Sequence, residues 1–230
     1  MLPRTLEPEV MDTREEAVDY DSMDHSGVNR VFVDDLLAAS QAAGFEKSSP
    51  SEPLRILDVG TGTAQIPIEL CRRPVNCDVW AIDLAVEMLL LAEQNVREAA
   101  LDGRILLEQE DAKAMNYSAA DFDWVISNSI VHHIPEPESS LCEMLRVLRS
   151  GGFFFVRDLL RPETDAEVET IVRTYAGGEN GDQQQLFRQS LHAALTVDEI
   201  RELMTSLGWS GECVSQNSDR HWTIAGVKPE

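Results

Sequence analysis

Residues 55–65 read RILDVGTGTAQ, a short apolar run followed by a turn that contains two glycines. The run over 55–60 has the length and composition of a buried strand. Gly60 and Gly62 allow a tight turn with backbone angles that other residues avoid, and we expect a helix to follow it through about Arg72. A strand, a glycine turn and a helix in this order form the first half of a βαβ unit, so a parallel α/β sheet is expected.

The chain beyond this turn alternates short apolar runs with helical patterns, which is typical of a doubly wound sheet. The further predicted strands are 77–83, 104–111, 122–129, 153–159, 210–217 and 221–228. The last two have the spacing of a hairpin. We therefore predict one α/β domain over residues 1–230 with a mostly parallel sheet.

Helices are predicted where apolar residues recur at intervals of three and four. The two clearest faces are Ala85, Met88, Leu89, Ala92 and Val96, and then Leu141, Met144, Leu145 and Leu148. We expect the second helix to stop at Gly151 and Gly152, which suit a left-handed C-terminal cap. Thr196 and Glu199 form a capping box, which predicts a helix to about Leu207.

Two segments lie outside this alternation. Residues 1–44 are predicted to form a helical N-terminal cap, in which Thr13 and Glu16 make a capping box. Its predicted apolar face is Val28, Val31, Phe32, Leu36 and Ala39. Residues 161–195 are predicted to form a helical cover of two helices separated by the breaker GGENGD. We expect this cover to decide the choice of substrate.

The charge of the chain narrows the classes of partner. There are 41 Asp and Glu residues against 19 Lys and Arg, a formal net charge of −22. So acidic a surface repels polyanions, which excludes nucleic acid and anionic membranes as expected partners. No apolar run reaches the ~18 residues of a membrane span, and the N-terminus lacks the pattern of a secretory signal. We expect a cytoplasmic protein that is a monomer or a homodimer.

The cysteines carry no metal or disulfide signal. They are Cys71, Cys77, Cys142 and Cys213. None forms a C-x-x-C pair, and no histidine stands beside them at zinc spacing. We expect reduced thiols and no metal.

Ligands of a doubly wound sheet bind beyond the carboxyl ends of its strands. Here the first strand ends in the glycine turn, and the second ends in Asp83, where an acid can accept both hydroxyls of a ribose. This pairing predicts an adenosine-type ligand. The dinucleotide fingerprint G-x-G-x-x-G would need a glycine where the chain has Gln65, and no G-K-[ST] of a P-loop follows.

Over about residues 52–160, these ordered motifs resemble class I S-adenosylmethionine-dependent methyltransferases, in particular the small-molecule branch of the ubiquinone/menaquinone methyltransferase type. The resemblance implies a seven-stranded sheet of order 3-2-1-4-5-7-6 with an antiparallel last strand. It implies S-adenosyl-L-methionine as cofactor and S-adenosyl-L-homocysteine as product. The implied reaction moves a methyl group to O, N, S or C of a small-molecule acceptor by in-line displacement.

The resemblance also assigns cofactor contacts. They are Tyr20, Asp58, Gly60, Thr61, Gly62, Asp83, Leu84, Met88, Asp111, Ala112 and Asn128. In the family, an acid at the position of Asp58 and the glycine turn after it hold the methionine part of the cofactor. The family often has a third glycine in this turn, and Thr63 occupies its place here. The acid at Asp111 would accept from the adenine amine, and Asn128 would lie near the donor methyl. Three carboxylates suit a cofactor that is cationic at sulfur and lacks phosphate.

The predicted catalytic residues are His133, His132 and Asp158. Both histidines follow the fourth strand, and a histidine can take a proton from a hydroxyl, a thiol or an acidic carbon near neutral pH. Asp158 and Arg157 end the fifth strand and could face the acceptor. The alternatives are that the histidines shape the pocket floor or cap the next helix, and that Asp158 or Arg157 forms an ion pair between the strand end and a loop.

Other side chains have both a binding and a packing interpretation. In the predicted lid, Tyr20 and His25 either contact the ligand or only pack. The acceptor candidates of the cover are Tyr175, Phe187, Arg188 and His192. Their spacing is equally that of an amphipathic helix that packs.

Three other functions remain open, besides methyl transfer to a small molecule. An enzyme of the same fold that forms carboxy-S-adenosylmethionine would need a cationic clamp, which Arg157 or Arg188 would provide. The others are a non-catalytic cofactor-binding subunit and a nicotinamide oxidoreductase. No N-P-P-Y or D-P-P-Y follows the fourth strand, and no cysteine lies there, which argues against methylation of base amines, protein glutamine or cytosine C5.

Overall fold

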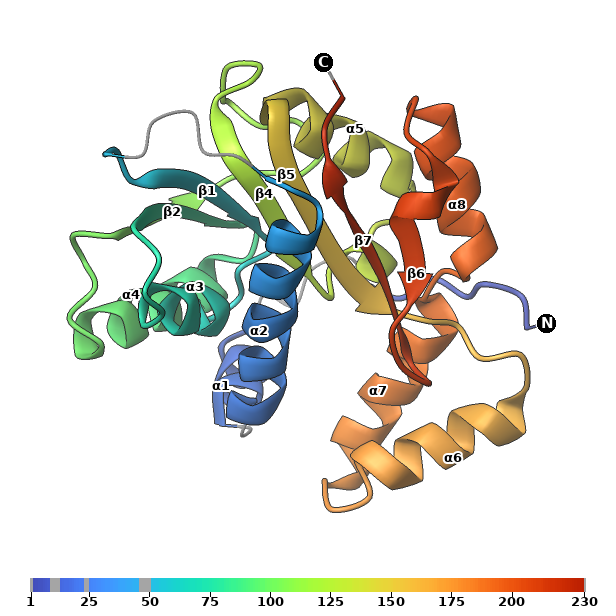
Figure 1. Cartoon of the computed structure of the whole chain (residues 1–230). Coiled ribbons are helices and arrows are strands. Elements are labelled where there is room, and N and C mark those ends of the chain that lie inside the picture. Colours follow the sequence, from blue (N-terminus) through green and yellow to red (C-terminus); the bar gives the residue numbers. More distant parts are fainter. Residues whose placement is uncertain (1, 9–12, 23–24, 46–50, 230) are drawn as a thin grey trace. The chain divides into compact units, whose positions relative to one another are not determined.

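A computed structural model of the chain describes residues 2–8, 13–22, 25–45 and 51–229 (Figure 1). Its helices are α1 (Arg14–Ser22), α2 (Ser26–Ala42), α3 (Gln65–Cys71), α4 (Val86–Glu98), α5 (Pro137–Val147), α6 (Asp165–Tyr175), α7 (Gly181–Ala193) and α8 (Val197–Ser206), with 3-10 turns at Val131–His133 and Gly211–Cys213. Its strands are β1 (Leu54–Val59), β2 (Cys77–Asp83), β3 (Ile105–Gln109), β4 (Phe122–Asn128), β5 (Leu148–Leu159), β6 (Val214–Gln216) and β7 (His221–Val227).

The strands form a seven-stranded sheet in the order β3-β2-β1-β4-β5-β7-β6. β1 pairs in parallel with β2 and with β4, and β2 pairs in parallel with β3. β6 and β7 pair antiparallel. Parallel neighbours need a crossover between them, which α3 and α4 supply for β1, β2 and β3. The order and the antiparallel hairpin confirm the sheet that the resemblance implied.

The chain divides into two compact units. The first unit comprises Met1–Glu9, Ser129–Glu138 and Arg157–Ile224, and the second comprises Val10–Asn128, Ser139–Val156 and Ala225–Glu230. The second unit therefore holds the glycine turn. The first holds the histidine pair and the 161–195 segment.

In the second unit, α2 packs on the strands through one apolar face (Figure 1). Phe32 and Leu36 are fully buried, and the Phe32 ring meets Phe155 edge to face at 5.2 Å. Each such side chain contributes roughly 1.5–3 kcal/mol when it leaves water. The prediction was wrong for Val28 and Val31, which are 48% and 54% exposed. The buried face is rotated away from them and takes in Val33 and Ser40 instead.

The end of α5 differs from the prediction. The helix stops at Val147, and Gly151 and Gly152 lie inside β5 rather than in a helix cap. Lys228 Nζ donates to the carbonyl oxygens of Leu145 and Leu148 at 2.6 and 2.7 Å, which satisfies acceptors that the last turn leaves open. The side chain of Lys228, just after β7, thus caps the end of α5 in place of the predicted glycines.

The two glycines have a different role within the strand. Gly151 is left-handed at φ +68°, and Gly152 is surrounded so tightly that an added Cβ would lie 2.8 Å from the backbone oxygens of Arg149 and Asp123. The strand can bend and pair there only because no side chain is present.

In the first unit, α6 and α7 form a helical hairpin (Figure 1). Side chains of both helices, with Leu159 from the end of β5 and Ala194 just after α7, make a small core of Leu159, Val168, Ile171, Val172, Leu191 and Ala194. The first four residues of the predicted breaker (177–180) lie between the two helices, and its last two, Gly181 and Asp182, begin α7. The predicted capping box before α8 is confirmed, because Thr196 N donates to Glu199 Oε2 at 2.8 Å and Glu199 N donates to Thr196 Oγ1 at 3.2 Å.

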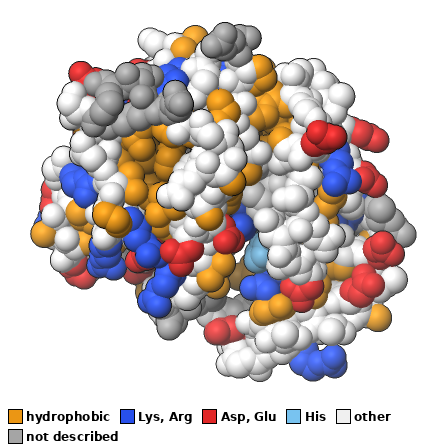
Figure 2. All heavy atoms as spheres, in the orientation of Figure 1, with side chains coloured by type: hydrophobic (Ala, Val, Ile, Leu, Met, Phe, Trp, Pro, Cys, Tyr) orange, Lys and Arg blue, Asp and Glu red, His pale blue; other side chains and the backbone are white. Residues whose placement is uncertain are grey.

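The N-terminal prediction holds in part. Among the described residues, the first helix begins at Arg14, and residues 2–8 form no helix. The side chain of Glu16 lies outside the described residues, and with it the predicted capping box. All four cysteines are free thiols. Within the described parts of the chain, no helix has the length and apolarity to cross a membrane. Figure 2 shows the Lys and Arg side chains of one face in small separate groups.

Candidate functional site

The turn after β1 alternates left-handed residues. The φ angles are +74° at Gly60, +54° at Gly62 and +62° at Ala64. Ala64 therefore occupies the third place in this alternation. The assignment of that place to Thr63 is wrong. Alanine in this region costs roughly 1–2 kcal/mol, so the turn holds a strained residue directly before α3.

Asp83 ties the end of β2 to this turn. Its Oδ2 accepts from Gly62 N at 2.8 Å, and its Oδ1 accepts from Ala85 N at 2.9 Å. The acid therefore fixes the shape of the turn.

Buried polar atoms without partners surround the same turn. Among the described residues, Asp58 Oδ2, Thr61 Oγ1 and Thr63 Oγ1 are buried and have no hydrogen-bond partner. Such atoms are costly unless something else binds them. Burial raises the pKa of Asp58 to about 7, the nearby Thr61 hydroxyl lowers it, and the charge of Asp83 raises it further. An ammonium and hydroxyls from a ligand would satisfy this set, as the methionine part and ribose of S-adenosylmethionine would.

Tyr20 lies over the turn from α1. A Cβ on Gly62 would lie 3.8 Å from Tyr20 Cε1, and the Tyr20 ring stacks near His25 at 4.7 Å. Asp21 anchors the helix by accepting from Asn95 Nδ2 at 2.9 Å. Desolvation raises the pKa of Tyr20, and the charges of Asp83, Asp21 and Asp58 raise it further. Tyr20, Asp58 and Asp83 therefore lie together around the turn between β1 and α3, and we call this group the cradle.

The remaining predicted cofactor residues differ in burial and in their partners. Met88 is buried with Ala85, whereas Leu84 is 36% exposed. Asp111 Oδ1 lies 3.1 Å from Lys113 Nζ. Burial alone would raise the pKa of Asp111, but the hydrogen bonds and charge of Lys113 lower it. Ala112 and Asn128 are half-buried, and Asn128 is the last residue of β4.

In the first unit, Asp158 holds the histidine loop. It is fully buried, and its Oδ1 lies 2.5 Å from His132 Nδ1 while its Oδ2 accepts from Val131 N at 2.5 Å. Burial alone would raise the pKa of Asp158, but His132 and the amide donors outweigh this and lower it. Asp158, at the end of β5, thus pairs with His132 in the loop after β4, as the alternative of a contact between strand end and loop predicted. Arg157 Nε donates to Thr223 Oγ1 at 3.0 Å.

Glu7 joins the two histidines from the N-terminal segment. Its Oε1 lies 3.1 Å from His133 Nδ1 and 3.5 Å from His132 Nε2. Its Oε2 accepts from Ser190 Oγ at 3.1 Å. Burial alone would lower the pKa of His133, but Glu7 and Asp158 outweigh it and raise that pKa. We call Glu7, His132 and His133, with Asp158 behind them, the histidine cluster.

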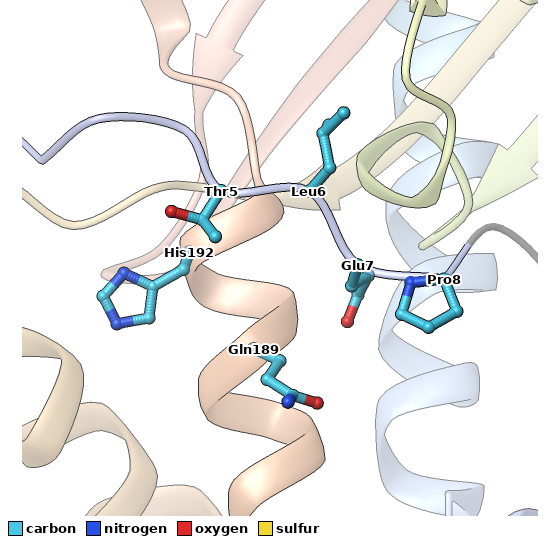
Figure 3. Close-up of a pocket in the computed structure, with 6 residues that line it drawn as sticks. All are labelled: Thr5, Leu6, Glu7, Pro8, Gln189 and His192. Atoms are coloured by element: carbon cyan, nitrogen blue, oxygen red, sulfur yellow. The ribbon is translucent and has the colours of Figure 1, made fainter.

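Arg4 fastens the segment that carries Glu7. Its guanidinium donates to the carbonyl oxygens of Ala193 at 2.7 Å, Ile134 at 2.9 Å, and His132 and Pro135 at 3.1 Å. The segment then borders a pocket of about 370 Å³ lined by Thr5, Leu6, Glu7, Pro8, Gln189 and His192 (Figure 3). Figure 3 shows Gln189 and His192 on α7 and the other four along the extended segment.

Comparison with known proteins agrees with the cradle. A family model described as a methyltransferase domain matches residues 57–156. The chain is 28% identical over 204 residues to the demethylmenaquinone methyltransferase of Porphyromonas gingivalis, which covers 83% of this chain and 80% of that protein. It is 37% identical over 99 residues to the phosphatidylethanolamine N-methyltransferase of Cereibacter sphaeroides, or 43% of this chain and 47% of that protein. Residues 57–156 are a class I S-adenosylmethionine-dependent methyltransferase domain.

Solved structures share the fold of this methyltransferase. A methyltransferase from Aquifex aeolicus aligns with a TM-score of 0.62 and 16% identity over 93% of this chain and 97% of the other. The plantazolicin methyltransferase BamL, solved with S-adenosylhomocysteine, aligns with a TM-score of 0.67 and 17% identity over 89% and 73%. At these identities the likeness concerns the fold.

The candidates in the 161–195 segment are mostly engaged in packing. Arg188 forms a two-pronged ion pair with Glu169, and Phe187 packs against the small core of α6 and α7. Tyr175 donates its hydroxyl to Asp219 under the guanidinium of Arg220. His192 alone of these four lines the described pocket. Arg188 pairs with Glu169, and Arg157 donates to Thr223. Neither guanidinium is therefore reserved for the additional carboxylate that formation of carboxy-S-adenosylmethionine would require.

Sequence reasoning missed Arg4 and Glu7. Both lie in a segment that was assigned to a helical cap, and no motif marks them. Pro3 and Pro8 enclose the segment, and two prolines so close together favour an extended chain over a helix. The two prolines therefore predict an extended segment, but they do not indicate where it binds.

Proposed function

We propose that this methyltransferase holds S-adenosylmethionine at the glycine turn and methylates a small organic molecule. The observation that carries the proposal is the set of unpartnered buried atoms at Asp58, Thr61 and Thr63, next to a carboxylate at Asp83 that already shapes the turn. When bound, the sulfonium cofactor supplies a methyl group for in-line displacement. The chain's part is to align the reactants and exclude water.

Each cofactor residue has a proposed task. Asp58 pairs with the ammonium of the methionine part, and Thr61 and the amides of the turn bind its polar atoms. Asp83 accepts from the ribose hydroxyls, and Tyr20 closes the cradle from above. The remaining contacts are proposed at Gly60, Gly62, Leu84, Met88, Asp111, Ala112 and Asn128.

The acceptor class is proposed from the relatives and from charge. Relatives of this chain are named for demethylmenaquinone and for 27-O-demethylrifamycin SV, both organic compounds rather than polymers. The net charge of −22 disfavours nucleic acid and anionic membranes. Four free thiols support a reducing, cytoplasmic setting, where we propose a monomer or homodimer.

We further propose that the histidine cluster acts on the acceptor. His132 and His133 are the groups that would touch it, and Asp158 is a positioning residue because it contacts His132 through Nδ1 and the loop through amides. His133 retains 20% side-chain exposure, whereas His132 has 4%. His133 is therefore the more accessible of the two.

Ligand-dependent melting tests the cofactor site. S-adenosylmethionine and S-adenosylhomocysteine should raise the melting temperature, and NAD should not. Asp83→Ala should abolish the shift, while Asp102→Ala, an exposed acid before β3, should keep it. Stabilisation by NAD without stabilisation by the sulfonium compound would overturn the proposal.

Turnover tests the histidine cluster. With 1,4-naphthoquinol as the first acceptor probe, release of S-adenosylhomocysteine should slow by roughly 10²-fold or more in His133→Ala, the range for loss of an activating group. Cofactor affinity should stay the same. Equal turnover in the variant would remove His133 from the reaction.

A further inference from the structure

Three ligand atoms converge in the histidine cluster. Glu7 Oε1, His132 Nε2 and His133 Nδ1 all lie within 4.8 Å of one another, and the three side chains are 7%, 4% and 20% exposed. Two imidazole nitrogens and a carboxylate oxygen form a common donor set for divalent transition metals. The donor atoms of the cluster therefore suit a divalent transition metal.

These atoms lie at ion-pair distances from one another, but Glu7 Oε1 and His133 Nδ1 form no aligned hydrogen bond. Over the described residues, Glu7 Oε1 and His133 Nδ1 are both buried and lack a hydrogen-bond partner, although only 3.1 Å separates them. A plain ion pair between Glu7 and a protonated His133 would bring the N–H into line with the oxygen. Here the alignment is missing, which is what is expected of atoms directed at a third point.

The separations fit such a point. Two ligand atoms that each lie ~2.0–2.1 Å from a tetrahedral ion are about 3.3–3.4 Å apart. Glu7 Oε1 is 3.1 Å from His133 Nδ1 and 3.5 Å from His132 Nε2, on either side of that value. An ion would need only small side-chain adjustments to enter.

The outer partners of the cluster are also those of a metal site. Asp158 engages Nδ1 of His132, which leaves Nε2 as the inward-facing nitrogen, and Ser190 engages the outer oxygen of Glu7. Carboxylates and hydroxyls behind ligating side chains fix their orientation in this way. Arg4 adds four hydrogen bonds to carbonyl oxygens that keep the Glu7 segment in place.

We propose that Glu7, His132 and His133 bind a divalent transition metal, with Zn²⁺ as its representative. Three protein ligands leave a fourth position open, as in catalytic rather than structural zinc sites. Mg²⁺ is excluded as the preferred ion because it selects oxygen ligands. The sequence carries no metal spacing, since Glu7 and the histidine pair are far apart along the chain and meet only in the fold.

The metal site rests on the proposed function in one respect. The open position would take an oxygen or nitrogen of the acceptor, so the cluster would activate the acceptor through the ion, with His133 as ligand rather than as base. Binding of the ion by the three side chains does not depend on the identity of the acceptor.

Metal binding is tested on the untagged full chain after dialysis against a chelator. Titration with Zn²⁺ at about pH 8, where imidazole is neutral, should show one site per chain, and Mg²⁺ should not compete. Co²⁺ in the same site should give the intense visible bands of tetrahedral coordination. Glu7→Gln and His133→Ala should each weaken Zn²⁺ binding at least tenfold, and Asp158→Asn about 10–100-fold. His192→Ala, a histidine outside the cluster, should leave affinity unchanged.

Two results would overturn the site. One is the absence of stoichiometric Zn²⁺ binding, and the other is binding that Glu7→Gln and His133→Ala leave intact. Cofactor binding, measured on the same samples with S-adenosylhomocysteine, separates this failure from failure of the proposed function. Binding of S-adenosylhomocysteine without Zn²⁺, together with slow turnover of His133→Ala, would return His133 to the role of a base.

Discussion

Asp58 should make cofactor affinity depend on pH. Its carboxyl is 2% exposed, and burial raises its pKa from 3.8 to about 7. A difference of about three pKa units corresponds to about 4 kcal/mol for ionising this group inside the chain. Because the folded pKa is raised, the folded chain binds an extra proton between about pH 4 and 7, and its stability falls as pH rises through that window.

Bound cofactor should reverse the preference of Asp58 for its protonated form. Its ammonium, protonated below about pH 7.7, favours the ionised form of Asp58, so binding should expel the extra proton. With a pKa of about 7, the ionised fraction is about 3% at pH 5.5 and 50% at pH 7. The affinity for S-adenosylhomocysteine should therefore be about sixteenfold weaker at pH 5.5 than at pH 7.

Calorimetry can measure both effects. Titrations in buffers of different ionisation enthalpy should report release of close to one proton near pH 6. Asp58→Asn should bind weakly and without pH dependence, and 5′-methylthioadenosine, which lacks the ammonium, should show no dependence in the parent chain. Equal S-adenosylhomocysteine affinity at the two pH values in the parent chain would refute the reasoning, as would unchanged pH dependence in Asp58→Asn.

Three further changes address the fold. Gly152→Ala should destabilise the chain by about 1–3 kcal/mol in urea unfolding, because its Cβ would meet backbone oxygens at 2.8 Å, whereas Gly103→Ala, with nothing within 4 Å, should stay near neutral. Lys228→Met should cost about 1–3 kcal/mol by removing the donor to the carbonyl oxygens of Leu145 in α5 and Leu148 in β5, and a neutral result would contradict the capping role. Thr196→Ala should lower the free energy of unfolding by about 1 kcal/mol, whereas Thr205→Ala, within α8, should not lose a cap.

The sheet could be predicted because its signals are local. Strand β2 has the predicted bounds, and β1 and β4 differ by a residue, since buried parallel strands read as continuous apolar runs between turn residues. The glycine turn, the acid at Asp83 and the capping box at Thr196 are likewise short patterns whose partners lie within a few residues or at the next strand end.

Long-range contacts account for the differences. The end of α5 is set by Lys228, more than 80 residues along the chain from Leu145. Burial on α2 follows what the helix packs against, so Val28 is exposed despite its apolar spacing. The histidine cluster depends on Glu7, whose segment reaches the histidines through the hydrogen bonds of Arg4. Neither periodicity nor a motif encodes contacts of this range.

Asp83 also has a kinetic consequence. Because its two oxygens already accept from Gly62 N and Ala85 N, the turn has its working shape before a ligand arrives. Little backbone ordering then remains to be done on encounter, so the association of nucleosides should proceed in a single phase without a slow rearrangement. Differences in affinity among analogues should appear in how long each stays bound rather than in how fast it enters.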